Sequence, residues 1–187
     1  MKTIAKKIIT IIIEWQARAV LARYKPKIIA ITGNIGKTSA KDAVYAVLSQ
    51  FNYVRKSEKS FNSEIGIPLT ILGFPNAWAS PAGWIKNIVN GFLMIIRTER
   101  YPEWLILEIG ADRPGDIARV AKWLKADIVI FTRFGEIPVH VEFFKTPDDL
   151  FAEKSLLLDA LKPDGTLILN MDDDRIMTLK AKTKTRV

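Results

Sequence analysis

The chain of 187 residues contains no cysteine and a single histidine, His140. The lack of cysteine excludes disulfides and thiolate metal sites, and it fits the reducing cytoplasm, where we expect the protein to act. Long apolar runs are also missing, since the run that starts at Ile8 stops at Glu14. Such a run is too short to cross a bilayer or to form the apolar part of a secretory signal.

An excess of positive charge is confined to the two ends of the chain. Residues 1–27 carry seven Lys/Arg and one Glu, and residues 175–187 carry five Lys/Arg and no acid. Between them, residues 28–174 carry 16 basic and 19 acidic side chains, so the body is mildly acidic. We therefore expect no nucleic-acid partner.

Residues 1–26 are expected to form a basic amphipathic helix ahead of a domain at 27–187. Apolar side chains recur there at helical spacing: Ile4, Ile8, Ile11, Ile12, Trp15 and Leu21. Two interpretations remain open for residues 1–24. The apolar stripe packs on a neighbouring domain or partner, or it makes a peripheral contact with an anionic membrane surface.

A phosphate-binding loop is the most informative motif. The segment KIIAITGNIGKTS at 27–39 reads as a buried strand, a glycine loop and the start of a helix. In such loops the lysine neutralises the β- and γ-phosphates of a nucleotide and the next hydroxyl ligates Mg²⁺. The expected nucleotide-binding residues are Gly33, Asn34, Gly36, Lys37, Thr38 and Ser39.

The spacing of this loop differs from the general pattern, which places a glycine where Ile31 stands. A glycine-rich turn followed by a helix-starting lysine is the alternative interpretation. The strand before the loop and the helical pattern after it favour the nucleotide site, with ATP and Mg²⁺ as cofactors.

Strand and helix patterns alternate along the rest of the chain, and apolar residues make up 49% of it. We expect strands at 28–32, 53–55, 104–109, 127–132 and 166–170, and helices at 37–49, 65–72, 82–97, 115–124, 147–161 and 173–182. This alternation predicts an α/β fold with a mainly parallel, doubly wound sheet of the P-loop type. Ligands of such sheets lie beyond the carboxyl ends of the strands.

Four residues near those strand ends are candidates for chemistry. Glu108 ends an apolar strand, where a carboxylate serves a nucleotide-bound Mg²⁺ or forms a structural salt bridge. His140 and Lys154 fit ordinary roles equally well, because a lone histidine says little and a helical lysine beside Glu153 is usually solvated. Asn170 precedes three aspartates at a strand-to-helix junction, where helix capping is the plain explanation.

Taken together, six ordered segments resemble the Mur ligase family, in the branch that adds D-alanyl-D-alanine to UDP-N-acetylmuramoyl-tripeptide during peptidoglycan synthesis. The segments are GNIGKTS at 33–39, FNSEIGIPLT at 61–70, LEIGADRPGDI at 107–117, HVEFF at 140–144, EK at 153–154 and LNMDD at 169–173. The resemblance covers residues 27–180 and accounts for the shortened phosphate loop.

The resemblance implies an ATP-dependent amide ligase. A UDP-muramoyl-peptide carboxylate would be activated as an acyl phosphate and attacked by an amine such as that of D-alanyl-D-alanine. It further implies catalytic roles for Lys37, His140 and Lys154, and metal ligation by Thr38, Glu108, His140 and a carbamylated Lys154. Asn170 would contact the nucleotide, and Asn62 and Ser63 would lie on the substrate side.

Departures from the family pattern leave the amine substrate open. Ser63 replaces a frequent Asn, and the pair Asp112-Arg113 replaces a common Asn-His. We also expect a central domain that is incomplete at its C-terminus, and 187 residues that do not complete ligation alone. The alternative function is a standalone ATP-binding module without turnover, associated with a membrane surface through its basic helix.

Overall fold

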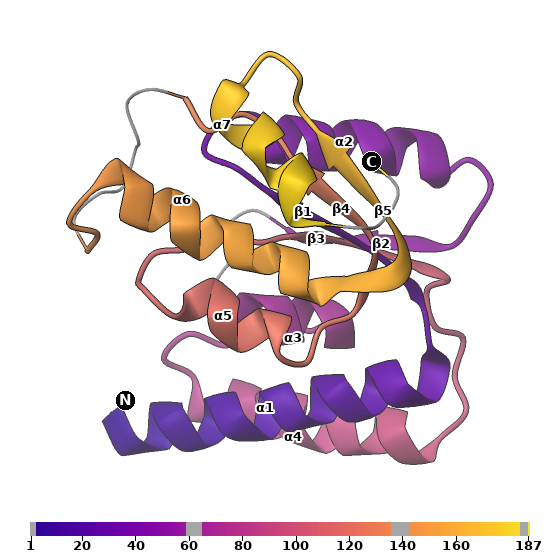
Figure 1. Ribbon diagram of the computed structural model, residues 1–187. Helices are drawn as coiled ribbons and strands as arrows, with labels where there is room; N and C mark the ends of the chain where they lie inside the picture. The colour runs from indigo at the N-terminus through magenta and orange to yellow at the C-terminus, as the bar shows by residue number, and fades with distance from the viewer. Residues whose placement is uncertain (1–2, 59–64, 136–142, 184–186) are drawn as a thin grey trace.

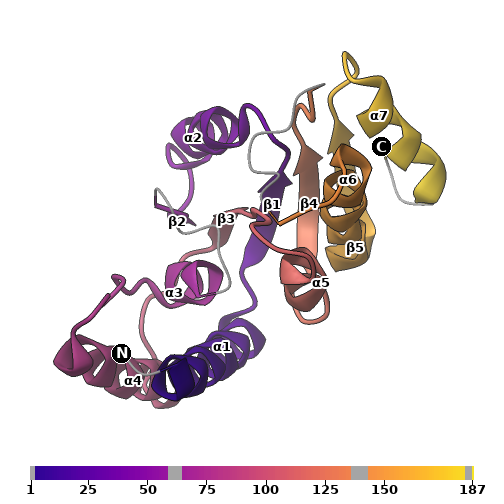
Figure 2. The same ribbon diagram turned by 90° about the vertical axis from the view of Figure 1, so that its left-hand side faces the viewer.

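The computed structural model describes residues 3–58, 65–135, 143–183 and 187. Its five strands form one sheet in the order β2-β3-β1-β4-β5, and every pair is parallel (Figure 2). The strands are β1 (Lys27–Thr32), β2 (Val54–Lys56), β3 (Trp104–Glu108), β4 (Ala126–Phe131) and β5 (Leu161–Leu169). The predicted parallel α/β sheet is confirmed.

Helices connect the strands and cover both faces of the sheet (Figure 1). They are α1 (Thr3–Tyr24), α2 (Lys37–Leu48), α3 (Gly66–Leu72), α4 (Pro81–Ile96), α5 (Asp116–Ala121), α6 (Pro147–Ser155) and α7 (Asp174–Met177). Two 3₁₀ segments, η1 (Leu156–Ala160) and η2 (Thr178–Lys182), follow α6 and α7.

The largest departure from the sequence prediction is at the start of β5. A helix was expected to run to residue 161, but α6 tightens into η1 and β5 already begins at Leu161. Pro163 cannot continue a helix, and Lys162 is drawn to the sheet because its Nζ lies 2.7 Å from Asp127 Oδ1. After β5, the expected helix at 173–182 is only the short α7 followed by η2.

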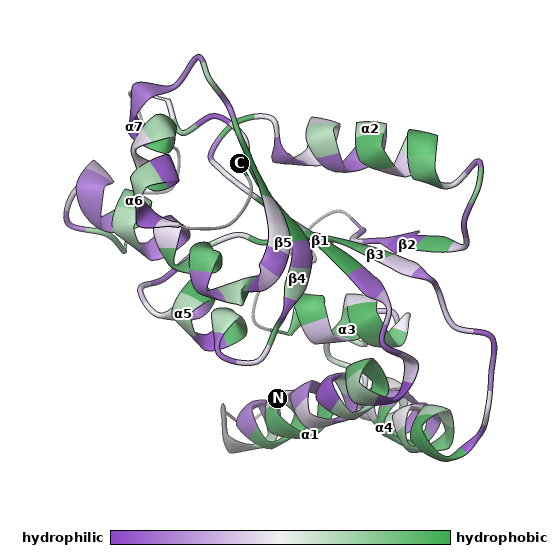
Figure 3. Ribbon diagram, turned by 45° about the vertical axis from the view of Figure 1, so that its right-hand side comes forward, coloured by the Kyte–Doolittle hydropathy of each residue, from purple (hydrophilic) through white to green (hydrophobic). Residues whose placement is uncertain are grey.

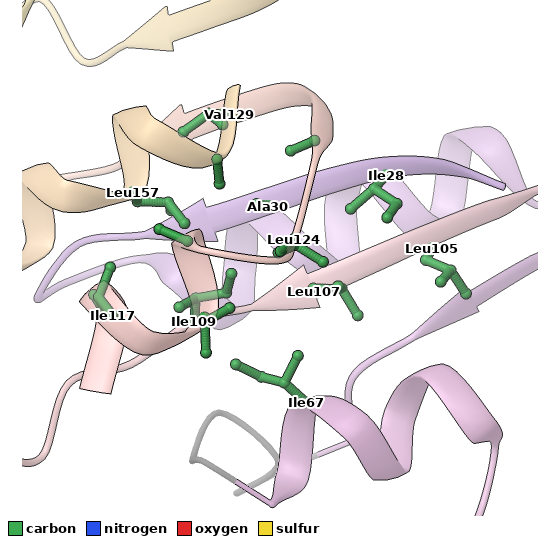
Figure 4. Close-up of a cluster of buried hydrophobic side chains, with 14 of the residues drawn as sticks. Ile28, Ala30, Ile67, Leu105, Leu107, Ile109, Ile117, Leu124, Val129 and Leu157 are labelled. Carbon is green, nitrogen blue, oxygen red and sulfur yellow. The ribbon is translucent and has the colours of Figure 1, made fainter. Parts of the chain in front are cut away.

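The two faces of β1 belong to different parts of the core. Ile29 and Ile31 pack with Ile106 against α2, whereas Ile28 and Ala30 point to the larger cluster on the other face. That larger cluster joins β3 to α3 and α5, as the positions of Leu107, Ile67 and Ile117 show (Figure 4). With both faces covered, the strands β1 and β3 are nearly continuous apolar runs, coloured green in Figure 3.

Helix α1 packs on α3 and α4 of the same chain. Its fully buried side chains are Ile13, Gln16, Ala17 and Val20, and Gln16 Nε2 donates to the carbonyl oxygen of Ile88 at 2.7 Å. The predicted helix is therefore present, but most of the apolar side chains that were expected to pack against a partner are not on its buried side. Ile8, Ile11 and Trp15 are exposed, while Ile12 and Leu21 are half-buried.

A matched pair of substitutions in α1 tests this packing. Ile13→Ala should lower the free energy of unfolding by about 2–5 kcal/mol, because Ile13 is 0% exposed and its loss leaves a cavity. Ile11→Ala, at a side chain that is 59% exposed, should change it by less than about 0.5 kcal/mol. Urea titrations of both variants measure the difference, and equal losses would contradict the observed orientation of α1.

Candidate nucleotide site

The glycine loop after β1 is held against the chain that follows β4. The amides of Asn34 and Ile35 both donate to the carbonyl oxygen of Arg133, at 2.8 and 3.0 Å. Gly33 and Gly36 have φ values of 141° and 85°, which favour glycine. A side chain at Gly33 would also collide with Thr132. The loop is thus a fixed turn.

Backbone amides of a phosphate loop commonly face the anion, but two of the amides in this loop do not. The N–H groups of Asn34 and Ile35 donate to Arg133, so the candidate donors for an anion are the amides of the first turn of α2. Gly36 is the N-cap of α2 and provides no side-chain cap. Uncapped first-turn amides, together with the helix dipole, form a site for a negatively charged group.

Lys37, the first residue of α2, lies over this loop. Its Nζ donates to the carbonyl oxygen of Asn34 at 3.2 Å. Burial lowers the pKa of Lys37, while the negative charge of Glu108 acts in the opposite direction. The sequence prediction that Lys37 belongs to the loop is matched by its position, and its role in binding phosphate remains a prediction.

Thr38 and Glu108, which were predicted from the sequence to be metal ligands, are in contact. Parallel pairing sets Ile31 beside Glu108, so the end of β3 lies next to the loop. Thr38 Oγ1 donates to Glu108 Oε2 at 3.0 Å. A hydroxyl and a carboxylate are the hard oxygen ligands that Mg²⁺ prefers, so these two groups fit that ion.

Glu108 also has the structural partner that the alternative interpretation required. Lys41 Nζ lies 3.6 Å from Glu108 Oε2, and both side chains are buried. Lys41 was missed by the sequence analysis, although its position one helical turn after Lys37 places it on the same side of α2. With Thr38 on one side and Lys41 on the other, the contacts of Glu108 suit either interpretation.

Lys154 is buried at the loop, and the sequence-based view of a solvated lysine is wrong. Its side chain is 6% exposed, and its Nζ donates to the carbonyl oxygen of Gly33 and to Asn34 Oδ1, both at 2.6 Å. Burial and the positive charge of Lys37 lower the pKa of Lys154 to about 7, although Asp112 acts in the opposite direction. A neutral amine is therefore accessible at physiological pH.

Glu153, the residue before Lys154, fixes the helix that carries it. Its carboxylate accepts hydrogen bonds from the amides of Gly115, Ile117 and Ala118, at 3.0, 2.8 and 3.2 Å. These amides belong to the start of α5, so Glu153 caps that helix from α6. The adjacent residues Glu153 and Lys154 thus tie α6 to α5 and to the phosphate loop.

A pocket of about 320 Å³ opens beside the loop at the ends of β4 and β5. Its lining consists of Arg133, Gly135, Asp172, Asp173, Asp174 and Arg175. Arg133 and Arg175 were not named as site residues from the sequence. The only signals were that Arg133 follows a strand and that Arg175 follows three aspartates. Two guanidinium groups give this pocket donors for a polar ligand.

Two acidic-turn residues have structural partners. Asn170 Oδ1 accepts from the amide of Asp172 at 3.0 Å in the turn before α7. The residue that caps this helix is Asp173, whose side chain accepts from the amide of Ile176. Asp173 Oδ2 accepts from the amide of Phe134 at 2.7 Å. Burial would raise the pKa of Asp173, but hydrogen bonds from backbone amides lower it overall. The role of Asn170 toward a nucleotide stays a prediction.

Three predicted site residues, His140, Asn62 and Ser63, lie outside the described residues. Among the residues that the structure describes, no group of three or more His, Cys, Asp or Glu side chains could hold a metal ion. The site within the described ranges therefore consists of the loop, Lys37, Thr38, Ser39, Glu108, Lys154 and the arginine-lined pocket.

Fold and site together define an α/β domain of the P-loop class, in which a glycine loop joins a central parallel strand to a helix. A family model for the Mur ligase middle domain matches residues 87–187, which is more than half of the chain. The chain therefore belongs to the Mur ligase family.

Individual relatives agree with this assignment. UDP-N-acetylmuramoyl-tripeptide--D-alanyl-D-alanine ligase of Mycobacterium leprae is 32% identical over 160 residues, covering 86% of this chain and 26% of that protein. The Bacillus subtilis ligase of the same name is 28% identical over 170 residues, covering 90% of this chain and 32% of the relative. The chain thus spans about a quarter to a third of the length of these relatives.

Solved structures share the fold. The crystal structure of MurF ligase from Thermotoga maritima in complex with ADP is 25% identical, with a TM-score of 0.69 over 95% of this chain and 35% of that one. MurF from Acinetobacter baumannii, at 19% identity, gives a TM-score of 0.69 over 94% of this chain and 33% of its own. The latter likeness extends to the fold alone.

The lowered pKa of Lys154 predicts a pH-dependent stability. Between about pH 7 and pH 10 the unfolded chain holds a proton on this lysine that the folded chain has lost, so unfolding becomes harder as pH rises. The free energy of unfolding of the wild type relative to Lys154→Met should rise by up to about 1.4 kcal/mol per pH unit in this range.

Denaturant titrations of both proteins in carbonate-free buffer measure this difference, because the other titrating groups are common to the two chains. A stability difference that is constant from pH 7 to pH 10 would contradict the lowered pKa. Lys122→Met, at an exposed lysine, is the control for replacing a lysine with methionine.

Proposed function

We propose that this chain is the nucleotide-binding and phosphoryl-transferring part of an ATP-dependent amide ligase of peptidoglycan precursor synthesis. The observation that carries the proposal is the meeting of Lys37, Thr38, Glu108 and Lys154 around one glycine loop in a Mur ligase middle domain. Support comes from relatives named as ligases that join D-alanyl-D-alanine to a UDP-muramoyl-tripeptide, and from a similar structure determined with ADP.

In this proposal the phosphate tail of ATP lies over the first turn of α2. The amides of that turn and the Lys37 ammonium neutralise the phosphate oxygens. Thr38 and Glu108 would hold Mg²⁺, which supplies positive charge to the phosphate groups when bound. Arg133 and Arg175, in the neighbouring pocket, would contact the sugar or base end of the nucleotide.

The reaction has two steps. The substrate carboxylate attacks the γ-phosphorus of ATP, a new P–O bond forms, and the bond to the ADP oxygen breaks. The amine of D-alanyl-D-alanine then attacks the acyl carbon, phosphate leaves, and the nitrogen loses a proton as the amide forms. Positive groups fixed around the loop stabilise the charge that moves during the first step.

Lys154 is proposed to act as a carbamate. The ammonium would first lose a proton, and the neutral amine would then attack CO₂, forming an N–C bond and releasing a second proton, so that a cation becomes an anion. Burial favours the first of these steps, because it disfavours the charged ammonium. The new anion would face the cation of Lys37, which now lowers the pKa of Lys154 by like-charge repulsion.

Removal of the loop lysine tests nucleotide binding. Lys37→Ala should weaken binding of Mg-ATP by about 2 kcal/mol or more, the scale of a charge-assisted contact that is left unmade. Lys122→Ala removes an exposed lysine just after the C-terminus of α5 and should leave the affinity unchanged. Titration calorimetry measures both, and equal affinity of the wild type and Lys37→Ala would contradict the proposal.

The substrate assignment needs a separate measurement. We expect the chain alone to hydrolyse ATP slowly. If the acyl phosphate forms and is then hydrolysed, added UDP-N-acetylmuramoyl-tripeptide should raise the rate of ADP formation. Lys37→Ala should abolish this increase. ADP formation that is indifferent to this carboxylate would reject the assigned substrate and leave nucleotide binding standing.

The carbamate can be observed directly. With ¹³C-bicarbonate at about pH 8, a carbamate carbonyl resonance should appear for the wild type and be missing for Lys154→Met, since a neutral amine is required. A wild-type spectrum identical to that of Lys154→Met at every bicarbonate concentration would return Lys154 to a purely structural role.

A further inference from the structure

Helices α1 and α4 lie side by side as a layer beyond α3, away from the sheet (Figures 1 and 2). The outward side of this layer carries seven large apolar side chains that are 43–71% exposed. We call it the α1–α4 apolar face, and its members are Ile8, Ile11, Trp15, Ile85, Val89, Phe92 and Ile96.

The face is continuous across the two helices. Ile8, Ile11 and Trp15 recur at spacings of three and four in α1, so they lie on one side of it. The four members in α4 follow the same rule. The two stripes meet where the rings of Trp15 and Phe92 lie 5.7 Å apart. Monomeric proteins seldom expose so many adjoining apolar side chains, which marks the face as a contact surface.

The helices that carry the face are firmly joined on their inner sides. Gln16 donates to the carbonyl oxygen of Ile88 at 2.7 Å, and the Tyr24 hydroxyl donates to the carbonyl oxygens of Met94 and Arg97 at 3.2 and 3.1 Å. Trp84 anchors α4 and is 3% exposed. The apolar face is therefore a preformed surface whose side chains need no rearrangement of the backbone to meet a partner.

Charge around the face indicates the partner. Residues 3–24 and 81–97 contain six Lys/Arg and one acid, Glu14, which pairs with Arg18 at 3.6 Å. Exposed bases on the two helices include Lys7, Arg18, Lys86 and Arg97. Residues 28–174 as a whole have more acids than bases, with 19 against 16. The two helices that carry the face therefore have a net positive charge, whereas residues 28–174 as a whole have a net negative one.

We propose that the α1–α4 apolar face docks on an anionic lipid surface. Exposed aromatic and aliphatic side chains among lysines and arginines are the pattern of helices that lie in a membrane interface, with the apolar groups below the headgroups and the bases among the phosphates. In the described part of the chain, no helix is long and apolar enough to cross a bilayer, so α1 and α4 lie along the surface.

A second copy of the chain suits the face less well. Two copies joined through it would bring together helices of the same net positive charge, an arrangement that opposes association. The layer is separated from the sheet by α3, so a lipid surface on its outer side leaves the glycine loop at the end of β1 open. Docking and nucleotide binding are therefore compatible.

Vesicle sedimentation tests the proposal, with phosphatidylcholine vesicles that contain or lack phosphatidylglycerol. The chain should sediment with the anionic vesicles, and added salt should weaken this binding. The double substitution Ile11→Asn and Val89→Asn should reduce the binding about tenfold or more, because both side chains lie in the face. Val47→Asn, at a 64% exposed position on α2, should bind like the wild type.

The three substituted positions are exposed, so the variants should fold as the wild type does. Thermal unfolding checks this. The variants should also keep the wild-type affinity for Mg-ATP. Equal vesicle binding by the Ile11/Val89 variant and the wild type would overturn the proposal. A wild type that does not bind anionic vesicles would also overturn it. If that wild type forms a dimer that the double substitution dissociates, the face would instead be assigned to a second copy of the chain.

Discussion

The central place of β1 is the constraint on which the rest of the molecule depends. This strand has β3 on one edge, β4 on the other, and a layer of side chains on each face. Because all three strands run in the same direction, the residues that follow them meet at one edge of the sheet. The glycine loop, Glu108 and Arg133 come together for this reason, although they are far apart in the sequence.

Electrostatic balance at that edge is maintained by a few buried groups. The ammonium groups of Lys37 and Lys154 approach the same loop, and the nearest hydrogen-bond acceptors of Lys154 are uncharged oxygens. Glu108 is shared between Thr38 and Lys41. Loss of the proton of Lys154 removes the repulsion between the two groups, and an anion at the loop would offset it.

Much of the fold could be predicted because the apolar strands are interrupted by glycines and alternate with helical patterns. The position of Glu108 near the glycine loop could be predicted from the rule that the carboxyl ends of parallel strands gather at one edge. The burial of Lys154 could not be predicted, because it depends on contacts with Gly33 and Asn34, more than a hundred residues away. The buried side of α1 was also missed, since isoleucines surround much of that helix and spacing alone does not say which of them meet α3 and α4.

The long separation between the loop and its lysine has a consequence for synthesis on the ribosome. Gly33 and Lys154 are 121 residues apart, and β1 pairs with strands that begin at residues 104 and 126. A nascent chain therefore carries the glycine loop well before it can build either neighbour of β1, and the amine arrives later still. Distant pairings of this kind are slow to form and leave apolar strand edges unpaired in the meantime. The interval between the emergence of β1 and of α6 is thus the period in which this chain most needs protection from association with other unfinished chains.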